Sequence, residues 1–355
     1  MLRFWFWPLL AFAAMLLPGS APAQQAPSRI VAVGDLHGDY DAWEAIARAA
    51  GLVDAKGKWS GGNTVLVQLG DVVDRGPDSL KIVHQLMKLQ KEAPKKGGRV
   101  IALVGNHEAM NMIGDLRYVH PGEYQAFVDR DSVARRDRAY EANKPKIEAA
   151  YRARTPTMDA ATVRSEWMKA TPLGMLEHQI AWRPDGEVGR WVVGNPAVVK
   201  LGGTLFVHGG ISATYTAIAI DEINRRVAND LKRQDEAPTA TINDPRGPLW
   251  YRGLILRGAD DPATQAPIDP KSGFALPIDQ EINLVLASFA VKRIVVGHTP
   301  SLKGIIEDDK GRLWRADSAI SRAYNGKLAY LEIMGDRVTT HEVQRPAGKA
   351  WGTTP

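Results

Sequence analysis

Cysteine is absent from this chain of 355 residues. The protein therefore has no disulfide, no thiolate metal ligand and no thiol that could accept a lipid. The sequence also lacks a Gly/Ser-rich linker between domains, and it has no internal repeat beyond a recurring strand–helix unit. With 45% hydrophobic and 24% charged residues, it is neither disordered nor of low complexity. We therefore expect one folded domain over residues 24–355, without covalent cross-links.

A strong excess of one charge is also absent, since 45 basic residues stand against 40 acidic ones and the net charge is +5. The basic residues alternate with acids along the chain, which is typical of a solvated surface. We therefore expect no nucleic acid among the partners of the protein.

The N-terminus has the composition of a secretory signal peptide. Arg3 precedes an uncharged apolar run of about 14 residues, and small residues follow up to Ala23. A membrane anchor is the alternative, but a spanning helix needs about 20 apolar residues, and Pro8 and Pro18 interrupt or end this run. We predict a signal peptide over residues 1–23, a periplasmic mature protein and no association of the mature form with membranes.

Apolar, β-branched runs alternate with amphipathic stretches in the first third of the mature chain. A strand predicted over residues 28–34 leads to a helix over 39–50, and a second strand over 64–69 leads to a helix over 77–92. A third strand is predicted over 99–104. Such serial strand–helix units predict an α/β fold with crossover helices.

The rest of the chain mixes helical and strand patterns. We expect strands over 190–200 and 203–207, a helix over 213–231 and a loop over 235–277. Short strands consistent with a second sheet follow at 292–297, 304–307, 312–316, 327–333 and 337–343.

A helical insertion is predicted over about residues 110–188. Its centre, residues 123–169, is rich in alanine and charged residues and has few β-branched clusters. From 129 to 169 there are 10 Lys or Arg against 7 Asp or Glu, an excess that would guide anionic substrates. Plain surface decoration is the alternative.

Side chains that bind hard or borderline metals follow five of the predicted strands. They are Asp35, His37, Asp71, Asn106, His208 and His298. The carboxyl ends of sheet strands are where open α/β folds build their sites, so we expect these residues at one edge. Any one of them alone would more often be structural, and only the combination predicts a site.

This set of ligands predicts two metal ions per chain. Carboxylates, an amide oxygen and imidazoles suit Mn, Fe, Zn or Co better than Ca. Six ligands are too many for one catalytic ion with open positions. They suit two divalent ions ~3.5–4 Å apart that share a carboxylate, activate a water and bind the oxygens of a phosphoryl group.

Three blocks resemble the signature motifs of phosphoprotein phosphatases, a superfamily of calcineurin-like metallophosphoesterases. GDLHG at 34–38, GDVVDRG at 70–76 and GNHE at 105–108 match GDxHG, GDxxDRG and GNHE, and two later histidine blocks surround His208 and His298. Longer stretches are similar to the Shewanella-like phosphatases: GNHEAMNMIGDLRYV, PLWYR, VVGHTP and LWRADSAIS. The resemblance implies two β-sheets packed as a central sandwich and flanked by helices.

The resemblance also implies a role for each residue. Asp71 would bridge the two ions. The other ligands divide by ion, with Asp35 and His37 on the first and Asn106, His208 and His298 on the second.

Four further residues complete the implied site. Arg75 and Arg252 would bind phosphate oxygens beside Asn106, since a guanidinium matches them bidentately. His107 would protonate the leaving alkoxide or phenoxide, and Asp74 would orient its imidazole. The alternatives are surface ion pairs for the two arginines and a passive position beside the metals for His107.

Two departures from the family concern the substrate. Val104 stands where the serine/threonine enzymes usually have Arg, and the interval from Asn106 to His208 is longer than theirs. We predict a metal-dependent phosphomonoesterase acting on phosphorylated protein, including phosphotyrosine, with which some Shewanella-like members are associated. The alternatives are a hydrolase of dinucleoside polyphosphates or other small phosphoesters, and a non-catalytic phosphate-binding module. The presence of every expected ligand argues against the last.

Overall fold

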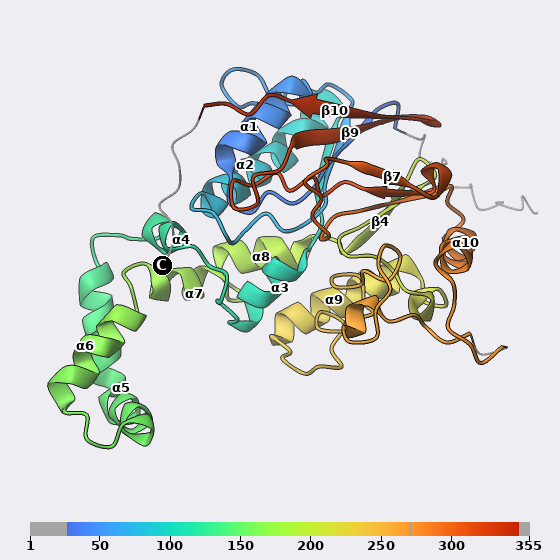
Figure 1. Cartoon of the computed structure of the whole chain (residues 1–355). Helices are drawn as coiled ribbons and strands as arrows, with labels where there is room; N and C mark the ends of the chain where they lie inside the picture. Colours follow the sequence, from blue (N-terminus) through green and yellow to red (C-terminus); the bar gives the residue numbers. More distant parts are fainter. Residues whose placement is uncertain (1–26, 270–271, 348–355) are drawn as a thin grey trace, which may run out of the picture.

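The computed structural model describes residues 27–269 and 272–347, so the predicted signal peptide lies outside the described residues. Two five-stranded sheets form the centre of the molecule (Figure 1). In the described part of the chain, no helix is both long and apolar enough to span a membrane.

The first sheet combines strands from both ends of the chain, in the order β10-β9-β1-β2-β3. Its strands are β1 (Ile30–Val33), β2 (Val65–Gln68), β3 (Arg99–Ala102), β9 (Leu328–Met334) and β10 (Arg337–Val343). The first three are parallel, and β9 pairs antiparallel with β1.

The second sheet has the order β4-β5-β6-β8-β7. Its strands are β4 (Val198–Leu201), β5 (Thr204–Val207), β6 (Arg293–Val296), β7 (Ile306–Asp308) and β8 (Leu313–Arg315). β5, β6 and β8 are parallel to one another, so each sheet presents several carboxyl ends at the same edge.

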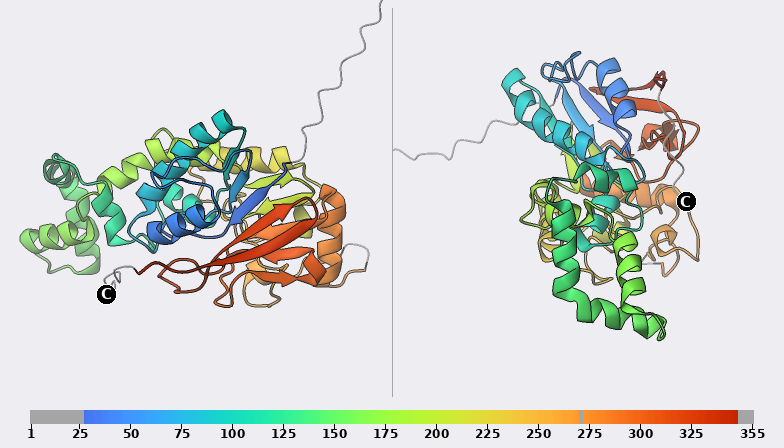
Figure 2. Two further views of the ribbon diagram at one scale, coloured as in Figure 1. Left: turned by 90° about the horizontal axis from the view of Figure 1, so that it is seen from above. Right: turned by 90° about the vertical axis from the view of Figure 1, so that its left-hand side faces the viewer.

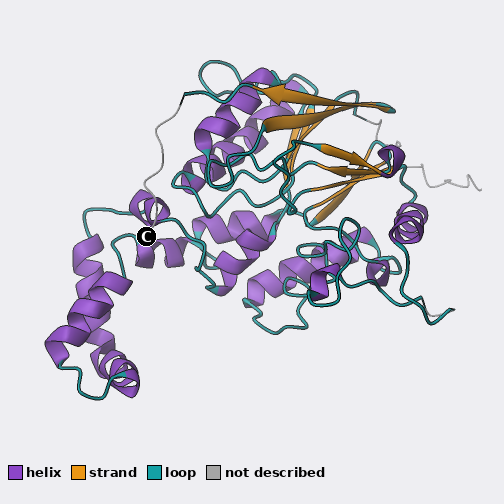
Figure 3. Ribbon diagram, viewed as in Figure 1, coloured by secondary structure: helices purple, strands orange, loops and turns teal. Residues whose placement is uncertain are grey.

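Successive side chains of a strand point to opposite faces of its sheet, and the apolar ones form two cores. Ile30 of β1, Phe206 of β5 and Val295 of β6 share one buried cluster, which places it between the sheets. The opposite faces are covered by helices on either side of the sheets (Figure 3). These helices include α1 (Tyr40–Ala49), α2 (Ser79–Glu92), α9 (Ile220–Arg233) and α10 (Ile278–Phe289). The predicted α/β sandwich flanked by helices is confirmed.

Helices dominate the chain between β3 and β4. They are α3 (Asn106–Ile113), α4 (Pro121–Ala126), α5 (Ser132–Arg154), α6 (Ala160–Ala170), α7 (Met175–Ala181) and α8 (Glu187–Gly194). α5 and α6, which we call the arm, project from the body (Figure 2). The arm buries few side chains, because α5 has polar residues all round.

Three of the predicted elements need correction. The strand expected from residue 190 is part of helix α8 up to Gly194, because Val188 and Val192 lie one turn apart and bury the same face. The helix expected from residue 213 starts as a short 3₁₀ turn, and the α-helix α9 begins only at Ile220. The last two strands, β9 and β10, join the first sheet rather than the second.

Candidate active site

The six predicted metal ligands come together where the parallel strands of both sheets end. Asp35, Asp71 and Asn106 follow β1, β2 and β3 of the first sheet, whereas His208 and His298 follow β5 and β6 of the second. The site is therefore shared by two sheets, and not built on the edge of one as the sequence suggested. All six side chains are buried, with 0 to 4% of their surface exposed.

The backbone at this site is strained. His37, Asp71 and His298 have φ angles of 42°, 51° and 64°, in the left-handed region that residues with a Cβ rarely adopt. The turns are also tight, because a Cβ on Gly105 would lie 2.2 Å from Asp71 Oδ1. Such strain typically marks a functional site.

Asp71 occupies the centre. Its Oδ1 accepts a hydrogen bond from the His107 backbone N–H at 2.9 Å and lies 3.3 Å from His208 Nε2. Its Oδ2 lies 3.8 Å from His37 Nε2 and 3.9 Å from His107 Nε2. Asp71 thus belongs to two groups of potential ligands, one with His37 and His107 and the other with His208 and His298.

The hydrogen bonds of the imidazoles fit a metal centre. His208 Nδ1 donates to the Leu69 carbonyl at 2.8 Å, so in the neutral ring Nε2 carries a lone pair. His208 Nε2 lies 3.0 Å from Asn106 Oδ1 and 3.3 Å from Asp71 Oδ1, so one nitrogen and two oxygens of predicted ligands gather around a single point. His298 Nε2 is buried without a hydrogen-bond partner. These residues therefore fit divalent metal ions.

The pKa shifts of His37, His298 and Asp71 suit metal binding as well. Burial, followed by the charge of His107, lowers the pKa of His37 to about 3. Burial and the charge of His208 hold the pKa of His298 well below its usual value. Burial acts to raise the pKa of Asp71, but the neighbouring His208, His107 and His37 outweigh it and hold that pKa well below the usual range. Neutral imidazoles and an ionised carboxylate are the forms that bind metals.

Asp35 lies in the same buried cluster but differs in its contacts. Both its carboxylate oxygens accept from the His298 backbone N–H at 3.1 Å. Burial, followed by the charges of Asp317 and Asp71, raises the pKa of Asp35 well above its usual value. Among the described residues, His107 rather than Asp35 completes the close group around His37 and Asp71.

His107 has the hydrogen bonds expected of an oriented acid. Its Nδ1 bonds to Asp74 Oδ2 at 2.6 Å, and Asn111 donates to the other oxygen of Asp74 at 2.9 Å. Burial lowers the pKa of His107, but the carboxylates of Asp71 and Asp74 outweigh it and the net pKa is raised. The ring can therefore carry a proton on Nε2 toward the buried ligands.

The two predicted arginines differ in their neighbours. Arg75 directly follows Asp74, and its guanidinium carbon lies 4.4 Å from the centre of the Tyr118 ring. Arg252 is half-buried, and its charge is one of the causes that lower the pKa of His298. Trp250, two residues earlier, has its ring 5.9 Å from the His298 ring. The segment around Arg252 therefore reaches the site.

Three contributors were missed from the sequence. The Glu108 carboxylate accepts from the backbone N–H groups of Asp71, Val72 and Gly105, at 2.8–2.9 Å, and so ties the loops after β2 and β3 together. Its position in the GNHE block was the available signal. Asp317, two residues after β8, lies in the LWRADSAIS stretch, which was its available signal, whereas Tyr324 lies beyond that stretch.

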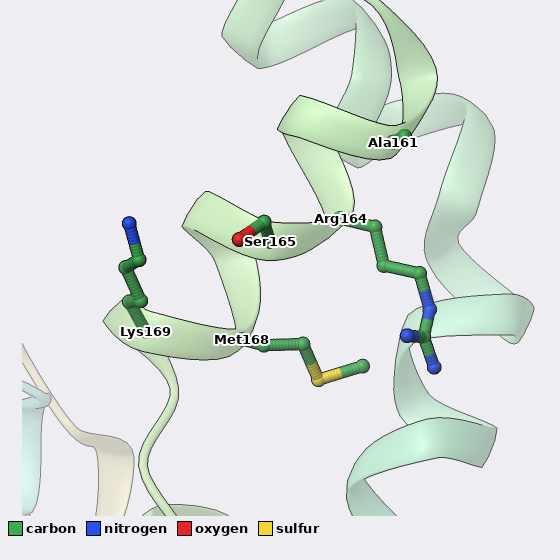
Figure 4. Close-up of a pocket in the computed structure, with 5 residues that line it drawn as sticks. All are labelled: Ala161, Arg164, Ser165, Met168 and Lys169. Carbon is green, nitrogen blue, oxygen red and sulfur yellow. The ribbon is translucent and has the colours of Figure 1, made fainter.

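A separate hollow of about 520 Å³ lies on the arm (Figure 4). Its lining comes from one helix, α6, and consists of Ala161, Arg164, Ser165, Met168 and Lys169. Arg164 is paired with Asp137 of α5 at 3.0 Å. This set holds no residue of the predicted site.

Comparison with known protein families identifies the family of this chain. The profile of the calcineurin-like phosphoesterases matches residues 28–302. The chain belongs to this family. As a calcineurin-like phosphoesterase, it is a hydrolase of phosphate esters.

This phosphoesterase is also similar to individual proteins. The chain is 31% identical to Shewanella-like protein phosphatase 2 of Arabidopsis thaliana, over 88% of this chain and 76% of that protein. It is also 31% identical to an uncharacterised protein of Schizosaccharomyces pombe, over 86% and 77% of the two chains. A cold-active protein-tyrosine phosphatase of a psychrophilic Shewanella shares the fold, with a TM-score of 0.62, 24% identity and coverage of 89% and 80%.

Proposed function

We propose that the protein is a metal-dependent phosphomonoesterase of phosphorylated proteins, with phosphotyrosine among its substrates. The observation that carries the proposal is the pair of buried ligand groups that share Asp71, one of which contains His107. The family supports the phosphoesterase chemistry. The names of the Arabidopsis relative and of the Shewanella structure support the choice of a protein and of tyrosine.

The proposed metal centre uses the ligands predicted from the sequence. Two divalent ions, Mn, Fe or Zn, would supply an activated water and offset the charge of the phosphate. Their ligands would be Asp35, His37, Asp71, Asn106, His208 and His298. The short distances around Asp71 Oδ1 and the unpartnered His298 Nε2 support this assignment.

The remaining residues bind the substrate and move a proton. Arg75 and Arg252 bind the phosphate oxygens beside Asn106. A water oxygen forms a bond to phosphorus, the bond from phosphorus to the ester oxygen breaks, and His107 Nε2 gives its proton to that oxygen. Asp74 keeps the imidazole oriented through its 2.6 Å hydrogen bond.

A periplasmic location remains part of the proposal. It is supported by the composition of residues 1–23, and it implies substrates outside the cytoplasm. Comparison of the mass of the exported protein with that of the full chain would test it. A mature form that still contains Arg3 would contradict it.

The function is tested by metal analysis of the purified protein together with a substrate panel. We expect about two ions per chain and turnover of phosphotyrosine peptides that a chelator abolishes and added metal restores. Phosphoserine peptides, dinucleoside polyphosphates and phosphodiesters complete the panel. Faster hydrolysis of dinucleoside polyphosphates than of every phosphopeptide would favour the small-molecule alternative and overturn the proposal.

A further inference from the structure

The half-buried Arg75 is held in an unusual way for a cation. Its guanidinium carbon lies 4.4 Å from the ring centre of Tyr118 and 5.2 Å from that of Tyr324. Among the described residues it forms no ion pair with a carboxylate, and its Nε is buried without a hydrogen-bond partner. The Arg75 guanidinium is therefore contacted by aromatic faces and not by a paired carboxylate.

Tyr118 also fixes the main chain of Arg75. The Arg75 N–H donates to the Tyr118 carbonyl at 2.9 Å. This bond matters because Asp74 and Arg75 have φ angles of 69° and 66°, two successive left-handed residues that need external support. The Tyr118 ring lies 5.1 Å from the His107 ring as well, which places it beside the predicted acid.

Tyr324 belongs to a loop that is fastened to the chain around His37. Ser321 Oγ donates to the His37 carbonyl at 3.2 Å, and Arg322 Nη1 donates to the buried Asp39 carboxylate at 2.6 Å. Arg345, near the end of β10, donates to the Gly326 carbonyl at 3.0 Å. These contacts hold the Tyr324 ring 5.5 Å from the His37 ring and facing Arg75.

We propose that Tyr118 and Tyr324 are positioning residues that hold the Arg75 guanidinium ready to bind phosphate. The inference rests on the proposed function, because it assumes that Arg75 contacts the phosphate. A carboxylate in place of the rings would compete with phosphate for the N–H donors. Aromatic faces attract the cation through their quadrupole and leave its N–H edge free.

The test compares leucine and phenylalanine variants at the two positions. Tyr118→Leu and Tyr324→Leu should each raise the dissociation constant of inorganic phosphate, measured by calorimetry on the metal-loaded protein, by roughly three- to tenfold. Tyr118→Phe and Tyr324→Phe should stay within about twofold of the unmodified protein, because the ring remains and neither hydroxyl makes a hydrogen bond among the described residues. Tyr330→Leu, which removes a ring of β9 that stacks on His341 of β10, is the control and should leave phosphate binding unchanged.

A double-mutant cycle shows whether the tyrosines act through Arg75. In an Arg75→Ala background, adding Tyr118→Leu or Tyr324→Leu should weaken phosphate binding no further. The proposal is overturned if the losses of phosphate affinity from Arg75→Ala and from a leucine substitution add in full. It is also overturned if the phenylalanine variants bind phosphate as weakly as the leucine variants. Because the readout is phosphate binding, the cycle stays informative if the protein hydrolyses none of the phosphomonoesters tested. That result would instead count against the proposed function.

Discussion

Asp71 is the residue on which both groups of potential ligands depend. It lies on the left-handed backbone just after β2, and its carboxylate is contacted by the backbone or ring of three histidines. The Glu108 carboxylate accepts a hydrogen bond from the Asp71 backbone N–H and so holds Asp71 in position. A change at Asp71 therefore affects both groups of potential ligands.

We expect Asp71→Asn to reduce metal binding and activity more than any other single substitution among the predicted ligands. The amide keeps the shape of the side chain but loses the charge that would bridge two ions. The measurement is metal content per chain together with turnover of an aryl phosphate, with circular dichroism as the control for folding. Two ions per chain and near-normal turnover would show that Asp71 is not the bridge.

A second change separates proton transfer from metal binding. We expect His107→Ala to lower kcat by roughly 10²–10³-fold and to leave metal content nearly intact, although His107 Nε2 lies within the first ligand group. The loss should shrink as the leaving group becomes more acidic, because such a group needs less protonation. Equal losses for p-nitrophenyl and alkyl phosphates would exclude His107 as the donor, and loss of metal would make it a ligand.

At the scale of elements, α7 carries a histidine unrelated to the site. His178 is fully buried among the rings of Tyr124, Phe127 and Trp182, and in the described structure neither of its ring nitrogens has a hydrogen-bond partner. Burial lowers its pKa from 6.5 to about 3. The folded protein therefore cannot bind the proton that the unfolded chain accepts.

This depressed pKa predicts an acid sensitivity. Between pH 6.5 and about 3 the unfolded state binds more protons at His178, so the free energy of unfolding falls as the pH falls through that window. From pH 6 to pH 5, the natural protein should lose about 1 kcal/mol more stability than His178→Leu. Urea unfolding at the two pH values measures this difference. The exposed His84→Gln is the control, and a pH dependence unaffected by His178→Leu would refute the account.

The arm offers a test of substrate steering. Arg135 and Arg136 are poor sites for it, because Arg135 is paired with Asp129 and Glu177 and Arg136 donates to the Thr171 carbonyl. The exposed residues Arg138, Lys144 and Lys146 form no ion pair within the described structure.

Reversal of these three charges to Glu should raise KM for phosphopeptides by roughly threefold or more at low salt. KM for a small aryl phosphate should hardly change, since that ester needs only the residues of the proposed active site and not the arm. The difference should shrink at higher ionic strength, where steering is screened. An equal effect on both substrates, or none on either, would leave the arm as surface structure.

At the scale of the whole molecule, the two ends of the chain depend on each other. β9 pairs with β1 and places Leu331 and Ile333 in the core between the sheets. Arg29, next to β1, bonds to Glu332 at 2.5 Å. The first sheet is therefore complete only after the last strands have formed.

A chain that ends at residue 326 should fail to fold, because it loses β9, β10 and one wall of the inter-sheet core. Circular dichroism and resistance to proteolysis measure this. A chain that ends at residue 347 keeps every described element and is the control. A stable truncated protein would show that β9 is dispensable.

The sequence by itself determined which kinds of ligands are present and which strands precede them. Alternation of apolar residues and the turns after each strand are local properties, so β1, β2, β3, β5 and β6 were predicted close to their observed bounds. The identity of the family followed from the same local blocks, and the profile match confirmed it.

The tertiary structure alone decided how these pieces meet. Strand patterns do not specify a partner, so only the fold placed β9 beside β1 and divided the ligands between two sheets. Likewise, the contacts of Arg75 with Tyr118 and Tyr324, and of Asp35 with Asp317, join segments far apart in the chain. Such contacts depend on packing between distant elements, which no local pattern encodes.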